Sequence, residues 1–237
     1  MKKRNSKILF FLVLLVVCLY LNHADDIKRS LSRSKDTVIS YSVDEIPEYE
    51  GKPYIVLNDN EPEFDDLAKT TNSFEVYSEL DKLGRCGEAY ANISVDLMPT
   101  TKRERIGIVK PSGWQTTKYD IIKDGKYLYN RCHLIAYQLT GENANEKNLI
   151  TCTRYTNSIT MVEFETMVGN YIRNTKNHVL YRATPIFKGD NLVASGIRLE
   201  AYSVEDKGKG IKFNVYIYNI QPGIEIDYKT GKSKIIK

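Results

Sequence analysis

Asn130-Arg131-Cys132-His133-Leu134 ends a strand-like run, and the interpretation of this chain depends on it. After a polar loop comes a second run, NLITCTRYTN, from Asn148 to Asn157. His133 is one of only three histidines, and it alone lies among basic, amide and aromatic residues rather than in a linker or a plain strand. The two runs therefore hold a potential general base and a potential metal ligand at a fixed separation.

The segments around His133 predict a ββα unit. Two β-prone runs, 118–122 and 126–129, flank Lys123-Asp124-Gly125, and an Asp-Gly turn between such runs is typical of a hairpin. A helix is expected from about 159 to 174, where six apolar residues recur at helical spacing: Met161, Phe164, Met167, Val168, Tyr171 and Ile172. This arrangement would bring His133 from the strand side towards the helix.

The rest of the chain predicts mainly strands. In residues 212–220, Phe213, Val215 and Ile217 alternate with Tyr216 and Tyr218, which is the pattern of a strand with two different faces. Further strands are expected at 54–57, 74–77, 89–95, 179–187 and 192–203. Strands, one informative helix and more strands indicate an α+β domain built on an antiparallel β-sheet core.

The N-terminus indicates export. A basic start is followed by an apolar stretch from Ile8 to Leu21, which resembles a signal peptide and is shorter than the roughly 20 residues of a membrane span. A cleaved signal peptide and an uncleaved membrane anchor both fit residues 1–24, and a lipid-modified Cys18 is a third interpretation. We expect a polar linker over 25–52, one domain over 53–237, and a protein that is secreted or anchored on the outer face of the cell membrane.

The charge balance excludes a protein that is basic as a whole. The formal net charge of +4 comes from Lys2, Lys3, Arg4 and Lys7, and the remaining 30 basic residues equal the 30 acidic residues in number. Nucleic acid would therefore have to bind a local patch, and the densest is Lys102 to Arg105 together with Lys110. A solvated loop is an equally acceptable interpretation of that patch.

The cysteines leave the redox state open. Cys86, Cys132 and Cys152 follow the apolar leader, and an odd number cannot all pair internally. A bridge from Cys132 to either of the others is possible after export, but free, partly buried thiols are slightly favoured. Cys132 is expected in the core, facing away from His133, and no Cys/His spacing typical of structural zinc occurs.

The motif resembles that of a known family. Asn130-Arg131-Cys132-His133 is similar to the Asp-Arg-Gly-His motif of the DNA/RNA non-specific endonucleases, which are ββα-metal or His-Me finger nucleases. The resemblance runs from about residue 54 to 228, is strongest to exported streptococcal-type DNases, and includes KPSGW at 110–114, NEKNLI at 145–150 and TRY at 153–155. Asn130 replaces the motif's Asp and Cys132 its Gly; we expect activity to survive because the Asp is not the base.

The resemblance implies roles for single residues. His133 matches the general base, Asn157 the only protein ligand of a Mg²⁺ ion for which Mn²⁺ can substitute, and Glu165 the acid that holds a metal-bound water. Glu163 competes for the last role, and Asn157 taken alone would be read as a helix N-cap. Arg131 is expected either at the substrate phosphate or in an ion pair. The remaining candidate substrate contacts are Arg103, Arg105, Arg154 and Asn130.

The expected function is hydrolysis of phosphodiester bonds. We expect an exported, monomeric, Mg²⁺-dependent endonuclease that cuts DNA, with RNA as a further candidate substrate, shows little sequence specificity and leaves 5′-phosphates. Its activity should climb through a His133 pKa of about 6.5 or somewhat above. The alternatives are a nucleic-acid-binding or uptake module without turnover, against which the intact His133, Asn157 and Glu165 argue, and a thiol hydrolase using Cys152, for which no oxyanion motif is present.

Overall fold

The computed structural model describes residues 40–123 and 125–236, so the predicted leader or anchor, the first part of the linker and Asp124 of the predicted turn lie outside the described residues. Its strands are β1 (Ser40–Tyr41), β2 (Tyr54–Leu57), β3 (Phe74–Tyr77), β4 (Ala89–Ile93), β5 (Tyr129–His133), β6 (Leu149–Thr153), β7 (Val179–Ile186), β8 (Gly196–Ser203), β9 (Lys212–Tyr218), β10 (Ile224–Ile226) and β11 (Ser233–Ile235). Its helices are η1 (Val43–Glu45), η2 (Asn58–Asn60), η3 (Asp66–Ala68), α2 (Tyr137–Thr140), η4 (Glu146–Asn148), η5 (Thr156–Met161) and α3 (Val162–Thr175).

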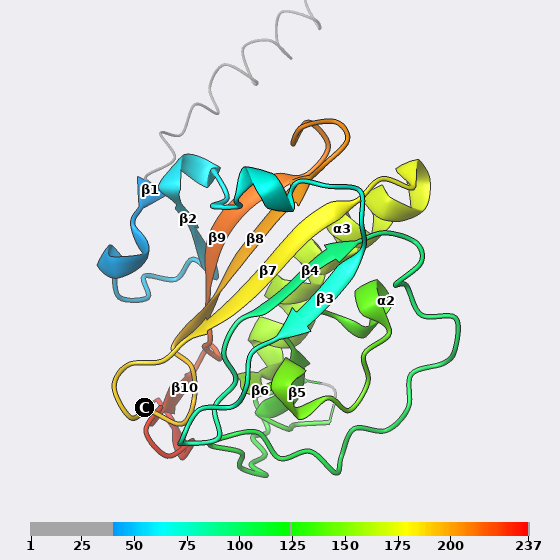
Figure 1. Ribbon diagram of the computed structural model, residues 1–237. Coiled ribbons are helices and arrows are strands. Elements are labelled where there is room, and N and C mark those ends of the chain that lie inside the picture. Colours follow the sequence, from blue (N-terminus) through cyan, green and yellow to red (C-terminus); the bar gives the residue numbers. More distant parts are fainter. Residues whose placement is uncertain (1–39, 124, 237) are drawn as a thin grey trace, which may run out of the picture. The chain divides into compact units, whose positions relative to one another are not determined.

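The main sheet has seven strands in the order β1-β2-β9-β8-β7-β4-β3, and every neighbouring pair is antiparallel except β1 with β2 (Figure 1). Phe213, Val215 and Ile217 of β9 enter the main core, where α3 packs on the sheet. Tyr216 and Tyr218 enter a second cluster on the other face, as the alternation predicts. The prediction of an α+β domain on an antiparallel sheet is confirmed.

A separate two-stranded sheet carries His133. β5 pairs antiparallel with β6, with Tyr129 opposite Thr153 and His133 opposite Leu149. The pairing predicted between 118–122 and 126–129 is present only in a short form. Lys118 and Tyr127 form one antiparallel bridge, flanked by backbone hydrogen bonds from Tyr119 to Lys126 and from Leu128 to Thr117, rather than a pair of full strands. The strand that carries His133 has its partner further along the chain, in β6, whose five residues are all buried.

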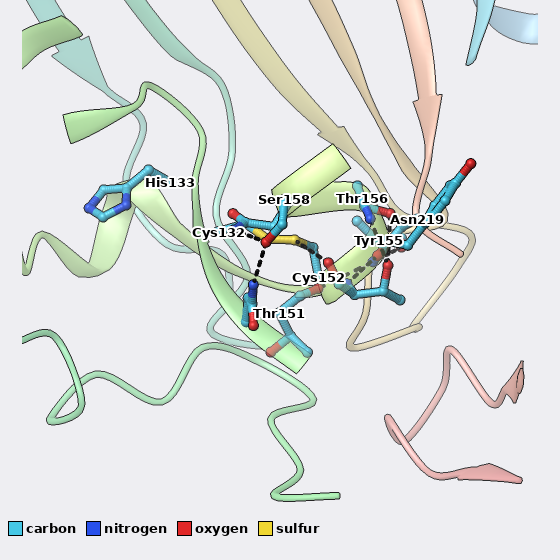
Figure 2. The surroundings of a disulfide bond; sticks show 12 residues. Cys132, His133, Thr151, Cys152, Tyr155, Thr156, Ser158 and Asn219 are labelled. Carbon is cyan, nitrogen blue, oxygen red and sulfur yellow. Dashed lines mark hydrogen bonds between the residues drawn. A yellow bond between two sulfur atoms is a disulfide. The ribbon is translucent and has the colours of Figure 1, made fainter. Parts of the chain in front are cut away.

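A disulfide ties the two strands of this small sheet together. Cys132 and Cys152 are bonded with their Cα atoms 5.8 Å apart, both side chains are fully buried, and Figure 2 shows His133 pointing away from the bond. The slight preference for free thiols was wrong for this pair and right for Cys86, which is buried and unbonded. The sequence does not show which cysteines pair. In the structure Cys132 and Cys152 lie diagonally across the adjacent strands β5 and β6, within reach of a disulfide bond.

Asn219, just after β9, joins the small sheet to the large one (Figure 2). Its side-chain oxygen accepts a hydrogen bond from the Thr153 amide at 2.9 Å, and its Nδ2 donates to the carbonyls of Thr151 and Ala194 at 3.2 and 2.9 Å. Because Asn219 is fully buried, these bonds satisfy a polar group that would otherwise destabilise the fold. They also fix where the strand before η5 and α3 ends.

Part of the predicted linker belongs to the fold. β1 pairs with β2, and the side chains of Tyr41, Val43 and Ile46 pack on the second face of the sheet. The folded unit therefore begins before Pro53. Within the described residues, no helix has both the length and the apolar character needed to cross a membrane.

Candidate active site

A pocket of about 400 Å³ lies where the end of β5, α2, η5, α3 and the loop around Arg103 meet. Four residues that the sequence analysis singled out line it together: His133, Asn157, Glu165 and Arg103. The other lining residues are Ala136, Tyr137, Gln138, Ser158 and Val162. The remaining predicted site residues, Arg131, Asn130, Arg105 and Arg154, are not among the lining residues.

Both ring nitrogens of His133 have partners that define its tautomer. Nε2 lies 2.8 Å from the carbonyl oxygen of Asn143, which can only accept, so Nε2 carries the proton. Nδ1 lies 3.4 Å from Nη2 of Arg103, which can only donate, so Nδ1 presents its lone pair. His133 is thus held as a neutral imidazole whose basic nitrogen faces the side where Arg103 lies.

Burial keeps that imidazole neutral. His133 is only 6% exposed, and this desolvation lowers its pKa to about 4, with Arg103 lowering it further while the bond to the Asn143 carbonyl raises it. The expectation of a pKa near or above 6.5 was therefore wrong. No pattern in the sequence around Asn143 indicated that its carbonyl would contact the His133 ring.

Asn157 lies inside η5, a π-helical turn that precedes α3, and not at a helix N-cap. Its Nδ2 donates to Ser158 Oγ at 3.5 Å, and the same Oγ lies 3.4 Å from Nδ2 of Asn130. Ser158 thus receives long contacts from both amides, and Figure 2 shows it above the Cys132–Cys152 disulfide. π-helical turns are rare in proteins as a whole, and those that occur often lie at functional sites. With Nδ2 engaged, Oδ1 of Asn157 is the atom available for a ligand.

Glu165 lies in the first turn of α3 and is half-buried in the pocket wall. Desolvation raises its pKa to about 7, and the charge of Arg103 opposes that shift. Its carboxylate accepts no hydrogen bond from any residue that the structure describes. Glu163 is exposed and does not line the pocket, which favours Glu165 in the acid role.

The donor set fits a hard divalent cation. The pocket brings together an amide oxygen without a hydrogen-bond partner among the described residues and a carboxylate whose charge burial disfavours, and a cation would relieve both. Mg²⁺ commonly takes one or two protein oxygens and keeps several waters, for which the cavity has room. In the described ranges no group of three or more His, Cys, Asp and Glu side chains gathers as a metal cage.

Arg131 holds a loop rather than facing the pocket. Its guanidinium donates to the carbonyls of Val109 and Gly107, the latter at 3.0 Å, and lies 4.0 Å from the ring centre of Trp114. No acidic side chain among the described residues pairs with Arg131, and its contact to a substrate phosphate stays a prediction. We assign Arg131 to the shape of the 107–114 segment.

Sequence reasoning missed Tyr137, Gln138 and Ser158 as pocket residues. Ser158 directly follows Asn157, so the prediction of Asn157 as a site residue could have indicated Ser158 as well. Tyr137 lies four residues after His133, but the four-residue helix that turns it into the pocket was not predicted.

Comparison with known proteins identifies the family to which this chain belongs. Residues 66–205 match the family model described as DNA/RNA non-specific endonuclease. The crystal structure of NucA from Streptococcus agalactiae with magnesium ion bound is 24% identical, with a TM-score of 0.70 over 82% of this chain and 92% of that one. The structure of Sda1 nuclease with bound zinc ion is 29% identical, with a TM-score of 0.57 over 69% of this chain and 80% of that one. Since the matched region exceeds half of the sequence, the chain belongs to the DNA/RNA non-specific endonuclease family.

Proposed function

We propose that this protein is an exported, Mg²⁺-dependent endonuclease that hydrolyses DNA, and RNA as a further candidate substrate, with little sequence specificity. The observation that carries the proposal is the state of His133, whose Nε2 proton is held by the Asn143 carbonyl while Nδ1 is left basic. A general base must be neutral and must offer a lone pair to water; Nδ1, whose one contact among the described residues is the long one to Arg103, is the nitrogen that would do so.

The other pocket residues have complementary roles. Asn157 would hold the cation through Oδ1 and Glu165 would orient a water in its shell, and Mn²⁺ can replace Mg²⁺ in such a site. When bound, the cation supplies positive charge that stabilises the oxygen leaving the phosphorus atom. Arg103, beside His133, offers a positive charge to the attacked phosphate.

The substrate contacts follow from the chemistry of the phosphodiester. The backbone is the same at every base, so contacts to phosphate carry no sequence information. Arg105, Arg154 and Asn130 lie outside the pocket lining, and we propose the two arginines as contacts to phosphates flanking the cut. Asn130 contacts Ser158 instead, so its proposed role is to support the Asn157 turn. Attack by water with departure of the 3′-oxygen gives 5′-phosphate products.

The cellular setting is proposed from the sequence. Residues 1–24 would direct export as a signal peptide or membrane anchor, and the protein would act as a monomer outside the cell. A disulfide in the described domain supports an oxidising destination, because such bonds persist mainly outside the cytosol.

The test compares plasmid cleavage by the full-length protein with Mg²⁺, with Mn²⁺ and with a chelator. His133→Ala should lose roughly 10²–10⁴-fold in rate and keep its fold and its DNA binding, and added imidazole should restore part of the loss. Asn157→Ala should cut only weakly at low metal concentration. His178→Ala is the matched control, because His178 pairs with Glu205 at 2.7 Å and does not line the pocket. A folded His133→Ala protein with near-normal turnover would overturn the mechanism.

A further inference from the structure

The segment that carries Arg103 has few attachments to the fold. Residues 100–105 are all exposed and form neither helix nor strand. Among the described residues, 99–105 make side-chain or backbone hydrogen bonds to two side chains only, those of His133 and Tyr137. The contact to His133 is the long one from Arg103 itself, so Tyr137 supplies the remaining attachment.

The Tyr137 hydroxyl is placed to supply that attachment. It donates to the carbonyl oxygen of Thr101 at 2.9 Å, and it lies 3.3 Å from Thr101 Oγ1. Tyr137 is the first residue of α2, whose later residues Leu139 and Thr140 are buried, so its backbone is fixed in the fold. The ring is half-buried and lines the same pocket as His133 and Arg103.

We propose that Tyr137 is a positioning residue that docks the 100–105 segment and thereby holds the Arg103 guanidinium at the pocket. An arginine side chain has many rotamers, and fixing its backbone two residues away reduces the conformational freedom lost when it meets a phosphate. The inference rests on the proposed function only for the role of Arg103. Docking of the segment follows from the hydrogen bonds alone.

The first experiment measures docking without any substrate. Lys102, Arg103 and Arg105 are trypsin sites within the segment, so limited trypsin digestion of the full-length protein reports how often it detaches. Tyr137→Phe removes only the hydroxyl, and loss of one ordinary hydrogen bond should speed cleavage after these residues about fivefold. Tyr127→Phe is the matched control, since Tyr127 is 42% exposed and its hydroxyl has no hydrogen bond among the described residues. Equal cleavage rates in wild type and Tyr137→Phe would overturn the proposal.

The second experiment tests whether docking acts through Arg103. Tyr137→Phe should lower kcat/KM by about fivefold in the wild-type background, with a thermal unfolding midpoint lowered by no more than the roughly 2–4 °C of one hydrogen bond. In an Arg103→Ala background the same substitution should cost nothing further, because the group to be positioned is gone. Unchanged kcat/KM in Tyr137→Phe, or losses that simply multiply in the double variant, would contradict positioning.

The failure of the proposed function is visible separately. An Arg103→Ala enzyme with wild-type kcat/KM would refute the role proposed for Arg103, and with it the claim that Tyr137 positions a working group. The trypsin comparison would then still decide whether Tyr137 docks the segment.

Discussion

The pKa values of His133 and Glu165 are shifted in opposite directions. Their effects on the pH dependence of the unfolding free energy should therefore cancel in the wild-type protein and become visible when either residue is replaced. Burial lowers the pKa of His133 to about 4 and raises that of Glu165 to about 7, each about 2.5 units from its ordinary value. Each shift corresponds to about 3 kcal/mol of unfolding free energy at its full extent. The two contributions have opposite signs.

The sign for each group follows from which state binds more protons. His133 has a folded pKa below its unfolded one, so its contribution is present above about pH 6.5 and is lost as the pH falls towards 4. Glu165 has a folded pKa above its unfolded one, so its contribution is present below about pH 4.5 and is lost as the pH rises through 7. Between pH 4.5 and 6.5 both change, in opposite directions.

Substitution of either residue should therefore reveal the pH-dependent stability contribution of the other. From pH 4.5 to 6.5, His133→Gln should lose about 2 kcal/mol of unfolding free energy relative to wild type, because only the Glu165 contribution remains. Glu165→Gln should gain about 2 kcal/mol over the same range, and the double variant should run parallel to wild type.

Urea unfolding of the full-length proteins, followed by Trp114 fluorescence at pH 4.5, 5.5 and 6.5, measures these differences. A chelator must be present, because a bound cation would stabilise the ionised Glu165. Other titrating groups contribute equally to all four proteins and disappear from the comparison. If both single variants ran parallel to wild type across this range, the burial argument for the pocket would be refuted.

Four further predictions concern other features of the molecule. Replacing Cys132 and Cys152 by Ser should lower the unfolding free energy by about 3 kcal/mol, the loop-closure value for a bond spanning 20 residues, as measured by urea denaturation with and without a reductant. The kcat/KM measured at saturating Mg²⁺ should show no His133 limb between pH 5.5 and 8, because its pKa is about 4; an acid limb near 6.5 would contradict the burial argument. Arg131→Met should free the 107–114 segment, with a change in Trp114 fluorescence and about 1.5–3 kcal/mol of lost stability from charged hydrogen bonds, whereas an unchanged spectrum would refute its structural role. Cleavage should slow as salt rises but with a shallow slope, since basic and acidic residues balance beyond the leader, and a steep slope would require many more phosphate contacts than we propose.

The sequence predicted those elements whose signal is local. Residues 54–57 and 74–77 form strands with the predicted bounds, and the alternation in 212–220 correctly separates Phe213 from Tyr216. The motif around His133 likewise led to a pocket that also holds Asn157 and Glu165. These predictions succeed because the alternation of side chains along a strand and the spacing of motif residues can be read directly from the sequence.

The features that could not be predicted depend on distant partners. β5 pairs with β6 across a long loop, and this pairing brings Cys132 to Cys152. The pKa of His133 depends on how deeply the fold buries the ring and on the carbonyl of Asn143, and no pattern in the sequence reports either. The π-helical turn at Asn157 replaces the ordinary helix start expected there.

The bond between Cys132 and Cys152 has a consequence for the cell that makes the enzyme. A nuclease without sequence preference endangers its producer's own chromosome for as long as it stays inside. Under the proposed export, the protein in a reducing cytosol would lack the covalent tie between β5 and β6, and would be less stable there than after export. On the proposed route, oxidation outside the cytosol would add this stability, so the bond would delay full stability until the nuclease is away from its producer's nucleic acid.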